Sequence, residues 1–85
     1  MNYPKAEAFH EKAIGILENL YCRWQDEKEY EDFDDYVKPL QPVAAACEVE
    51  IVAMKKRPFS IVYTSDGKRF ASVVTAKTTY FEIVA

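Results

Sequence analysis

The sequence predicts a small α+β domain, with two to three N-terminal helices followed by an antiparallel β-meander of three strands, or of four as the alternative. Two patterns predict this order. Apolar residues recur every three or four positions through residues 4–24, as on one face of an amphipathic helix. Apolar and polar residues alternate after residue 58, as in half-buried strands. The chain has 85 residues, of which 49% are hydrophobic, and this length suits a single domain over 1–85.

The first helix begins at Pro4, because a proline in the first turn lacks only an N–H that has no partner there. Gly15 interrupts the helix at a cost of about 1 kcal/mol relative to alanine. The apolar face of this helix is formed by Ala6, Phe9, Ala13, Ile16, Leu17, Leu20 and Trp24. We therefore expect this face to pack against the rest of the domain.

A second helix is expected through the acidic segment that follows. Tyr30, Phe33, Val37 and Leu40 recur at helical spacing, and Pro39 and Pro42 end the pattern. Carboxylates four positions apart repel each other, so this helix depends on packing for its stability.

Residues 43–56 are ambiguous. Their alanines favour a helix, and the cations at 55–57 before Pro58 are typical of a helix C-terminus. Residues 49–52 have the β-branched composition of a strand. A mostly buried helix is the first expectation here, and a fourth strand is the alternative.

Strands are expected at 59–64, 69–76 and 79–84. Asp66 and Gly67 lie between the first two and provide the positive φ angles that a tight hairpin needs. The last strand could form a sheet edge, where a second copy of the chain could pair with it to give a homodimer.

The composition argues against an enzyme and against a cofactor or metal site. One histidine, two cysteines and two glycines provide neither a zinc ligand set nor a glycine-rich phosphate loop. His10 is interpreted as a surface or capping residue, and Cys22 and Cys47 as buried thiols in a reducing compartment. No apolar stretch is long enough to span a membrane, and the N-terminus has no secretory signal, so a cytoplasmic protein is expected.

The acidic segment is the best candidate for a functional surface. Half of the 14 acidic residues fall within ten positions, with two tyrosines among or beside them. Such a surface would attract a basic surface on a partner protein, or imitate the charge of a nucleic acid. The simpler interpretation is a solvated helix face that keeps the chain soluble. The expected contact residues are Asp26, Glu27, Glu29, Tyr30, Glu31, Asp32, Asp34, Asp35 and Tyr36.

These features predict a small regulatory or inhibitory protein without enzymatic activity, of the class that phages and other mobile elements often encode. The alternative is a nucleic-acid-binding module. It would use one basic patch, provided that the end of the third helix lies near the hairpin turn. That patch would consist of Lys55, Lys56, Arg57, Lys68 and Arg69. Because the chain carries a net charge of −3, nucleic acid is the less favoured partner.

Overall fold

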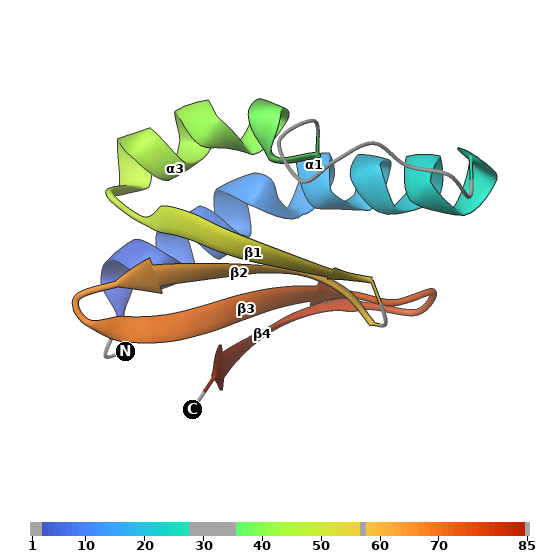
Figure 1. Cartoon of the computed structure of the whole chain (residues 1–85). Coiled ribbons are helices and arrows are strands. Elements are labelled where there is room, and N and C mark those ends of the chain that lie inside the picture. Colours follow the sequence, from blue (N-terminus) through green and yellow to red (C-terminus); the bar gives the residue numbers. More distant parts are fainter. Residues whose placement is uncertain (1–2, 28–35, 57, 85) are drawn as a thin grey trace.

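Helices pack on one face of a four-stranded antiparallel sheet (Figure 1). The computed structural model of the chain describes residues 3–27, 36–56 and 58–84. The predicted α+β class and antiparallel meander are confirmed, with four strands rather than three. The elements are α1 (Pro4–Glu27), η1 (Lys38–Leu40), α3 (Gln41–Cys47), β1 (Glu50–Lys56), β2 (Phe59–Ser65), β3 (Lys68–Val74) and β4 (Thr79–Val84).

Helix α1 buries the apolar face that its sequence predicts. Five residues of that face are buried in the core, namely Ala6, Phe9, Ala13, Leu17 and Leu20. The Phe9 ring meets the Tyr63 ring of β2 edge to face, with 4.5 Å between the centroids. Removing this apolar surface from water is the main force that holds α1 on the sheet.

The helix expected over 43–56 is wrong beyond residue 47, and the alternative of a fourth strand is correct. Helix α3 ends because Glu48 adopts a left-handed conformation, with φ 61°. The N–H groups of Glu48 and Val49 then donate to carbonyl groups of the last turn, Val49 to Ala44 at 3.0 Å. This reversal is a common helix end, although glycine usually occupies the left-handed position. The Glu48 carboxylate forms an ion pair with the Lys5 ammonium, at 2.7 Å. After this turn the chain continues into β1.

The sheet has the strand order β1-β2-β3-β4, so each strand pairs with the next in the chain. Asp66 and Gly67 have φ angles of 54° and 79° and form the predicted hairpin turn between β2 and β3. β4 has the predicted bounds, whereas β3 is two residues shorter at its C-terminal end than expected. Strand β1 carries an irregularity between Ile51 and Ala53, where Val52 interrupts the register.

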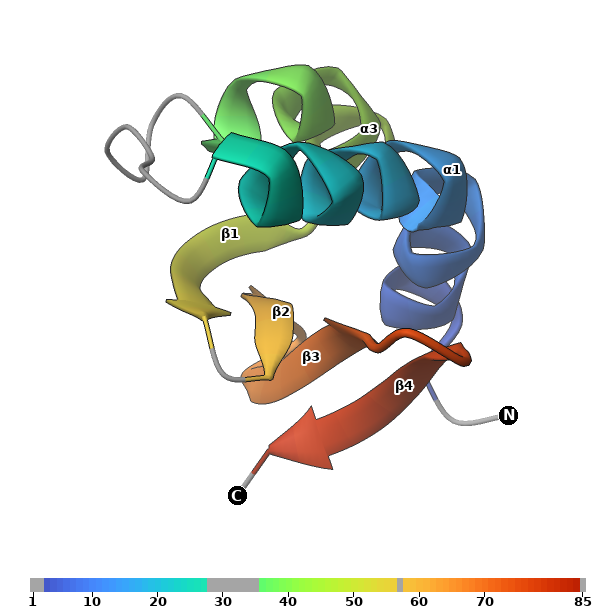
Figure 2. The same cartoon turned by 90° about the vertical axis from the view of Figure 1, so that its right-hand side faces the viewer.

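The two faces of the sheet have different environments. Because successive side chains in a strand point to opposite faces, Phe59, Ile61 and Tyr63 of β2 point toward the helices and join their core. Val62 and Ala71 point to the other face, which we call the outer face. Figure 2 shows both helices on one side of the curved sheet and no helix on the other.

Candidate functional site

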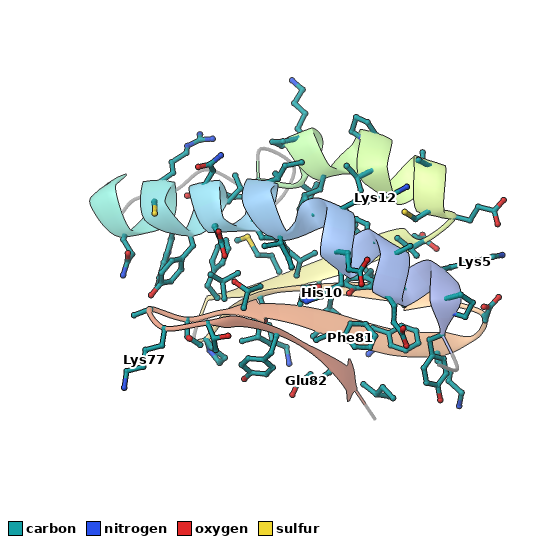
Figure 3. All side chains as sticks on the ribbon, turned by 180° about the vertical axis from the view of Figure 1, so that it is seen from behind. Lys5, His10, Lys12, Lys77, Phe81 and Glu82 are labelled. Atoms are coloured by element: carbon teal, nitrogen blue, oxygen red, sulfur yellow. The ribbon has the colours of Figure 1, made fainter. Side chains whose placement is uncertain are left out.

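The outer face of the sheet holds a shallow groove of about 320 Å³. Its floor includes Val62, Ala71 and Val73, which form a small apolar cluster separate from the main core. Lys55 and Glu82 are among the residues at its sides. Figure 3 shows Glu82 on the side of β4 away from the helices. The groove is therefore a small apolar depression with charges of both signs around it.

The predicted basic patch required the end of a third helix to lie near the hairpin turn, and the described residues do not have this arrangement. Residues 55 and 56 end a strand and not a helix, and Lys55 lies opposite Ser60 on β2. Arg69 lies opposite Thr64, which is about 14 Å farther along the strand at about 3.4 Å per residue. Lys68 is one residue farther still. Residue 57 lies outside the described residues, and the remaining cations are divided between opposite ends of the sheet.

The expected acidic contact surface lies largely outside the described residues. Asp26 and Glu27 contribute their backbone to the end of α1, and residues 28–35 are not described. Tyr36 is the exception, and its placement corrects the prediction. Its side chain is completely buried, so Tyr36 belongs to the core and does not contribute to a contact surface.

The described residues on either side of the acidic segment contact one core residue, Phe59. The Trp24 ring, three residues before the α1 end, stacks on the Phe59 ring with 5.7 Å between centroids. The Tyr36 ring meets the same ring at 6.4 Å, and the Arg23 guanidinium lies over Tyr36 at 5.4 Å. The chain therefore enters and leaves the acidic segment at the same end of the molecule.

His10, Ser72 and Tyr63 form a hydrogen-bonded chain between α1 and the sheet, which the sequence interpretation missed. The Ser72 Oγ lies 2.8 Å from His10 Nδ1 and 2.7 Å from the Tyr63 hydroxyl. The His10 ring also packs on Phe81 of β4, with 5.5 Å between centroids (Figure 3). His10 is thus partly buried in the helix–sheet interface and is not a surface or capping residue.

This chain of polar groups is part of the packing between α1 and the sheet. Ser72 is completely buried, so its hydroxyl cannot reach a substrate in this conformation. Burial raises the pKa of Tyr63 to about 12, although the hydrogen bond to Ser72 opposes the shift. Burial also lowers the pKa of His10 from its ordinary value of 6.5, with a smaller opposing effect from Glu11. Both side chains are therefore held in their neutral forms at neutral pH.

The lowered pKa of His10 predicts a loss of stability in mild acid. The unfolded chain takes up the histidine proton near pH 6.5, before the folded chain does. The free energy of unfolding should therefore be highest above this value and decrease as the pH falls toward the lower folded pKa. Urea denaturation between about pH 8 and pH 5 measures this decrease. The His10→Asn variant, which cannot titrate, should lose most of it, and an equal pH dependence in both proteins would contradict the assignment.

A second depression, of about 380 Å³, lies between α1 and the β3–β4 turn. Cys22, Glu18 and Lys77 are among its lining residues, and the Thr79 hydroxyl donates to the Glu18 carboxylate at 3.2 Å. Cys22 is exposed, which corrects the prediction of a buried thiol, whereas Cys47 is buried as expected.

Ligand clusters and membrane helices are lacking in the described part of the chain. No group of three or more histidine, cysteine or acidic side chains within residues 3–27, 36–56 and 58–84 is arranged to hold a metal ion. Over the same ranges, no helix combines the length and the apolarity needed to cross a membrane.

Comparisons with known proteins identify no relative. The chain matches no family model, no curated protein sequence and no solved structure. Its function is therefore inferred from the chemistry and arrangement of its own residues.

Proposed function

We propose that this chain is a small non-enzymatic regulatory or inhibitory protein that binds a basic surface of a partner protein through its acidic segment, residues 26–35. The observation that carries the proposal is the concentration of seven of the 14 acidic residues in ten positions. The contact residues are Asp26, Glu27, Glu29, Tyr30, Glu31, Asp32, Asp34 and Asp35.

The packing on either side of the segment supports this proposal. Trp24 and Tyr36 both contact Phe59, which is 1% exposed. A segment that lies between two residues packed on the core loses less conformational freedom on binding than a free tail does. Charge concentrated in such a segment would speed association with a basic partner and fix its orientation.

The described residues offer little support for an enzyme instead. The histidine–serine pair that could suggest a nucleophile has its hydroxyl completely buried. The two depressions are shallow and open, and a catalytic carboxylate pair needs two groups in a shaped cleft with different environments. The free thiols of Cys22 and Cys47 suit a reducing compartment, and we place the protein in the cytoplasm.

Neutralising the acidic segment should weaken partner binding while the fold is kept. The Asp32→Asn, Asp34→Asn and Asp35→Asn triple variant removes three negative charges without changing side-chain size. We expect about a tenfold loss of affinity, mostly from slower association. The measurement is a pull-down with the parent and the variant from nuclease-treated lysate of the source cells or their host, followed by binding kinetics with the captured protein.

A charge-matched control separates a local effect from one of net charge. The Glu7→Gln, Glu11→Gln and Glu50→Gln triple variant makes the same change in net charge on α1 and β1, outside the acidic segment. This control should bind the captured protein as the parent does. Equal binding by both triple variants and the parent would overturn the proposal, and equal weakening by both would show that net charge alone is responsible.

A further inference from the structure

The two edges of the sheet differ in how well they are protected against pairing with another strand. β1 has an irregular register around Val52 and ends in two lysines, and both features discourage pairing. β4 is regular over all six residues and has one charged side chain, Glu82. It also carries two exposed apolar side chains, Tyr80 at 41% and Ile83 at 54%. β4 is therefore an unprotected edge.

The hydrogen bonding of the β3–β4 turn shows which backbone groups of β4 face outward. The Thr75 N–H donates to the Thr78 carbonyl at 2.8 Å, so these two residues form a hydrogen-bonded pair. Bonded and non-bonded pairs alternate in an antiparallel ladder, and the β3–β4 register is continuous. The residues of β4 that bond to β3 are Tyr80, Glu82 and Val84. The N–H and C=O groups of Thr79, Phe81 and Ile83 therefore point toward the open edge.

We propose that β4 pairs with β4 of a second copy in antiparallel register, with Phe81 opposite Phe81, to form a dimer with one eight-stranded sheet. A two-fold axis perpendicular to the sheet keeps the helices of both copies on the same face. In this register the outward groups of Thr79, Phe81 and Ile83 meet those of Ile83, Phe81 and Thr79 of the second copy. Every outward N–H and C=O group of β4 then gains a partner.

Two neighbouring registers would also keep the inner faces of both sheets on one side and their outer faces on the other. Both are less favourable. Centring the pair on Glu82 places two carboxylates directly opposite each other, which is destabilising. Centring it on Tyr80 leaves the groups of Ile83 without partners. The Phe81 register instead places Tyr80 opposite Glu82 of the second copy on the outer face. It also covers part of Ile83, the most exposed of the large apolar side chains described.

A proline at position 83 tests the pairing directly. The Ile83 N–H points outward, so Ile83→Pro removes a bond to the second copy and none to β3, as edge-strand prolines do. Sedimentation of the purified chain from nanomolar to millimolar concentration should show the parent rising from 9.8 kDa to twice that mass. Ile83→Pro should stay at the mass of one chain with an unchanged circular dichroism spectrum, and the matched Ile83→Val variant should dimerise. A parent of constant single-chain mass, or a dimeric Ile83→Pro, would overturn the proposal.

Disulfide trapping tests the register and does not depend on the proline variant folding. Tyr80→Cys and Glu82→Cys are made as separate proteins, each with Cys22→Ser, then mixed and oxidised. The Phe81 register predicts mainly mixed disulfides between positions 80 and 82, because these residues would lie directly opposite. Predominant 82–82 or 80–80 disulfides, or none, would overturn it. The isolated chain is used throughout, so the result is independent of the function proposed for the acidic segment.

Discussion

Replacing Phe59 with alanine should cost about 3–5 kcal/mol of the free energy of unfolding, as is usual for a buried phenylalanine. Its side chain is 1% exposed and, among the described residues, contacts the rings of Tyr21, Trp24 and Tyr36. Domains of this kind are stable by only about 5–15 kcal/mol in total. The variant should therefore be close to unfolded, and urea denaturation followed by circular dichroism measures the loss.

An exposed apolar residue of the same sheet provides the control. Val52 is 40% exposed in the irregular part of β1, and Val52→Ala should change the free energy of unfolding by no more than about 0.5 kcal/mol. If Phe59→Ala lost as little stability as this control, the cluster around Phe59 would not be a centre of the core. In that event, the proposed fixing of the acidic segment would fail with it.

The elements predicted best from the sequence are those whose local signals agree with the final packing. In α1, the apolar face and the N-terminal Pro4 indicate the same helix, and five of the seven residues of that face are buried. The Asp66–Gly67 turn is similar, because the chemistry of two residues is enough to select the hairpin.

The sequence does not predict the end of α3, because the residue at the helix end is neither glycine nor asparagine. Glu48 adopts the left-handed conformation that glycine or asparagine usually adopts at a helix C-terminus. The four alanines and the cations near residue 56 extend a helical pattern over a segment that pairs with β2. The β-branched residues at 49–52 were the better guide, since pairing with β2 outweighs the local helix propensity.

The contacts of His10 illustrate a limit set by distance along the chain. Its partner Ser72 is 62 positions away, and the spacing of apolar residues carries no information about such a pair. One signal was available, because Ser72 lies between Phe70 and Val74 on the same face of β3. A polar residue on a buried face needs a hydrogen-bond partner, and this need predicts a polar group on the opposing helix.

Removing the Ser72 hydroxyl is expected to cost about 1–3 kcal/mol, because Ser72→Ala leaves two neighbours without their hydrogen-bond partner. With neutral His10 accepting at Nδ1, Ser72 donates to it and accepts from Tyr63, at 2.8 and 2.7 Å. Tyr63 is 0% exposed, so its hydroxyl cannot turn to water in the variant. Urea denaturation at pH 7.5 to 8, well above the ordinary pKa of 6.5 for histidine, measures the loss without interference from protonation.

A double-mutant cycle separates this cost from the loss of packing. Tyr63→Phe removes the hydroxyl that is hydrogen-bonded to Ser72. The double variant therefore no longer has an unpaired phenol in the core. The double variant should therefore lose less stability than the two single variants added together, as expected for groups that share a hydrogen bond. Strict additivity would show that the two hydroxyls are not coupled. Coupling would show that a side-chain hydrogen bond between Ser72 and Tyr63 joins β3 to β2 in the core beneath α1, in addition to the backbone pairing of the two strands.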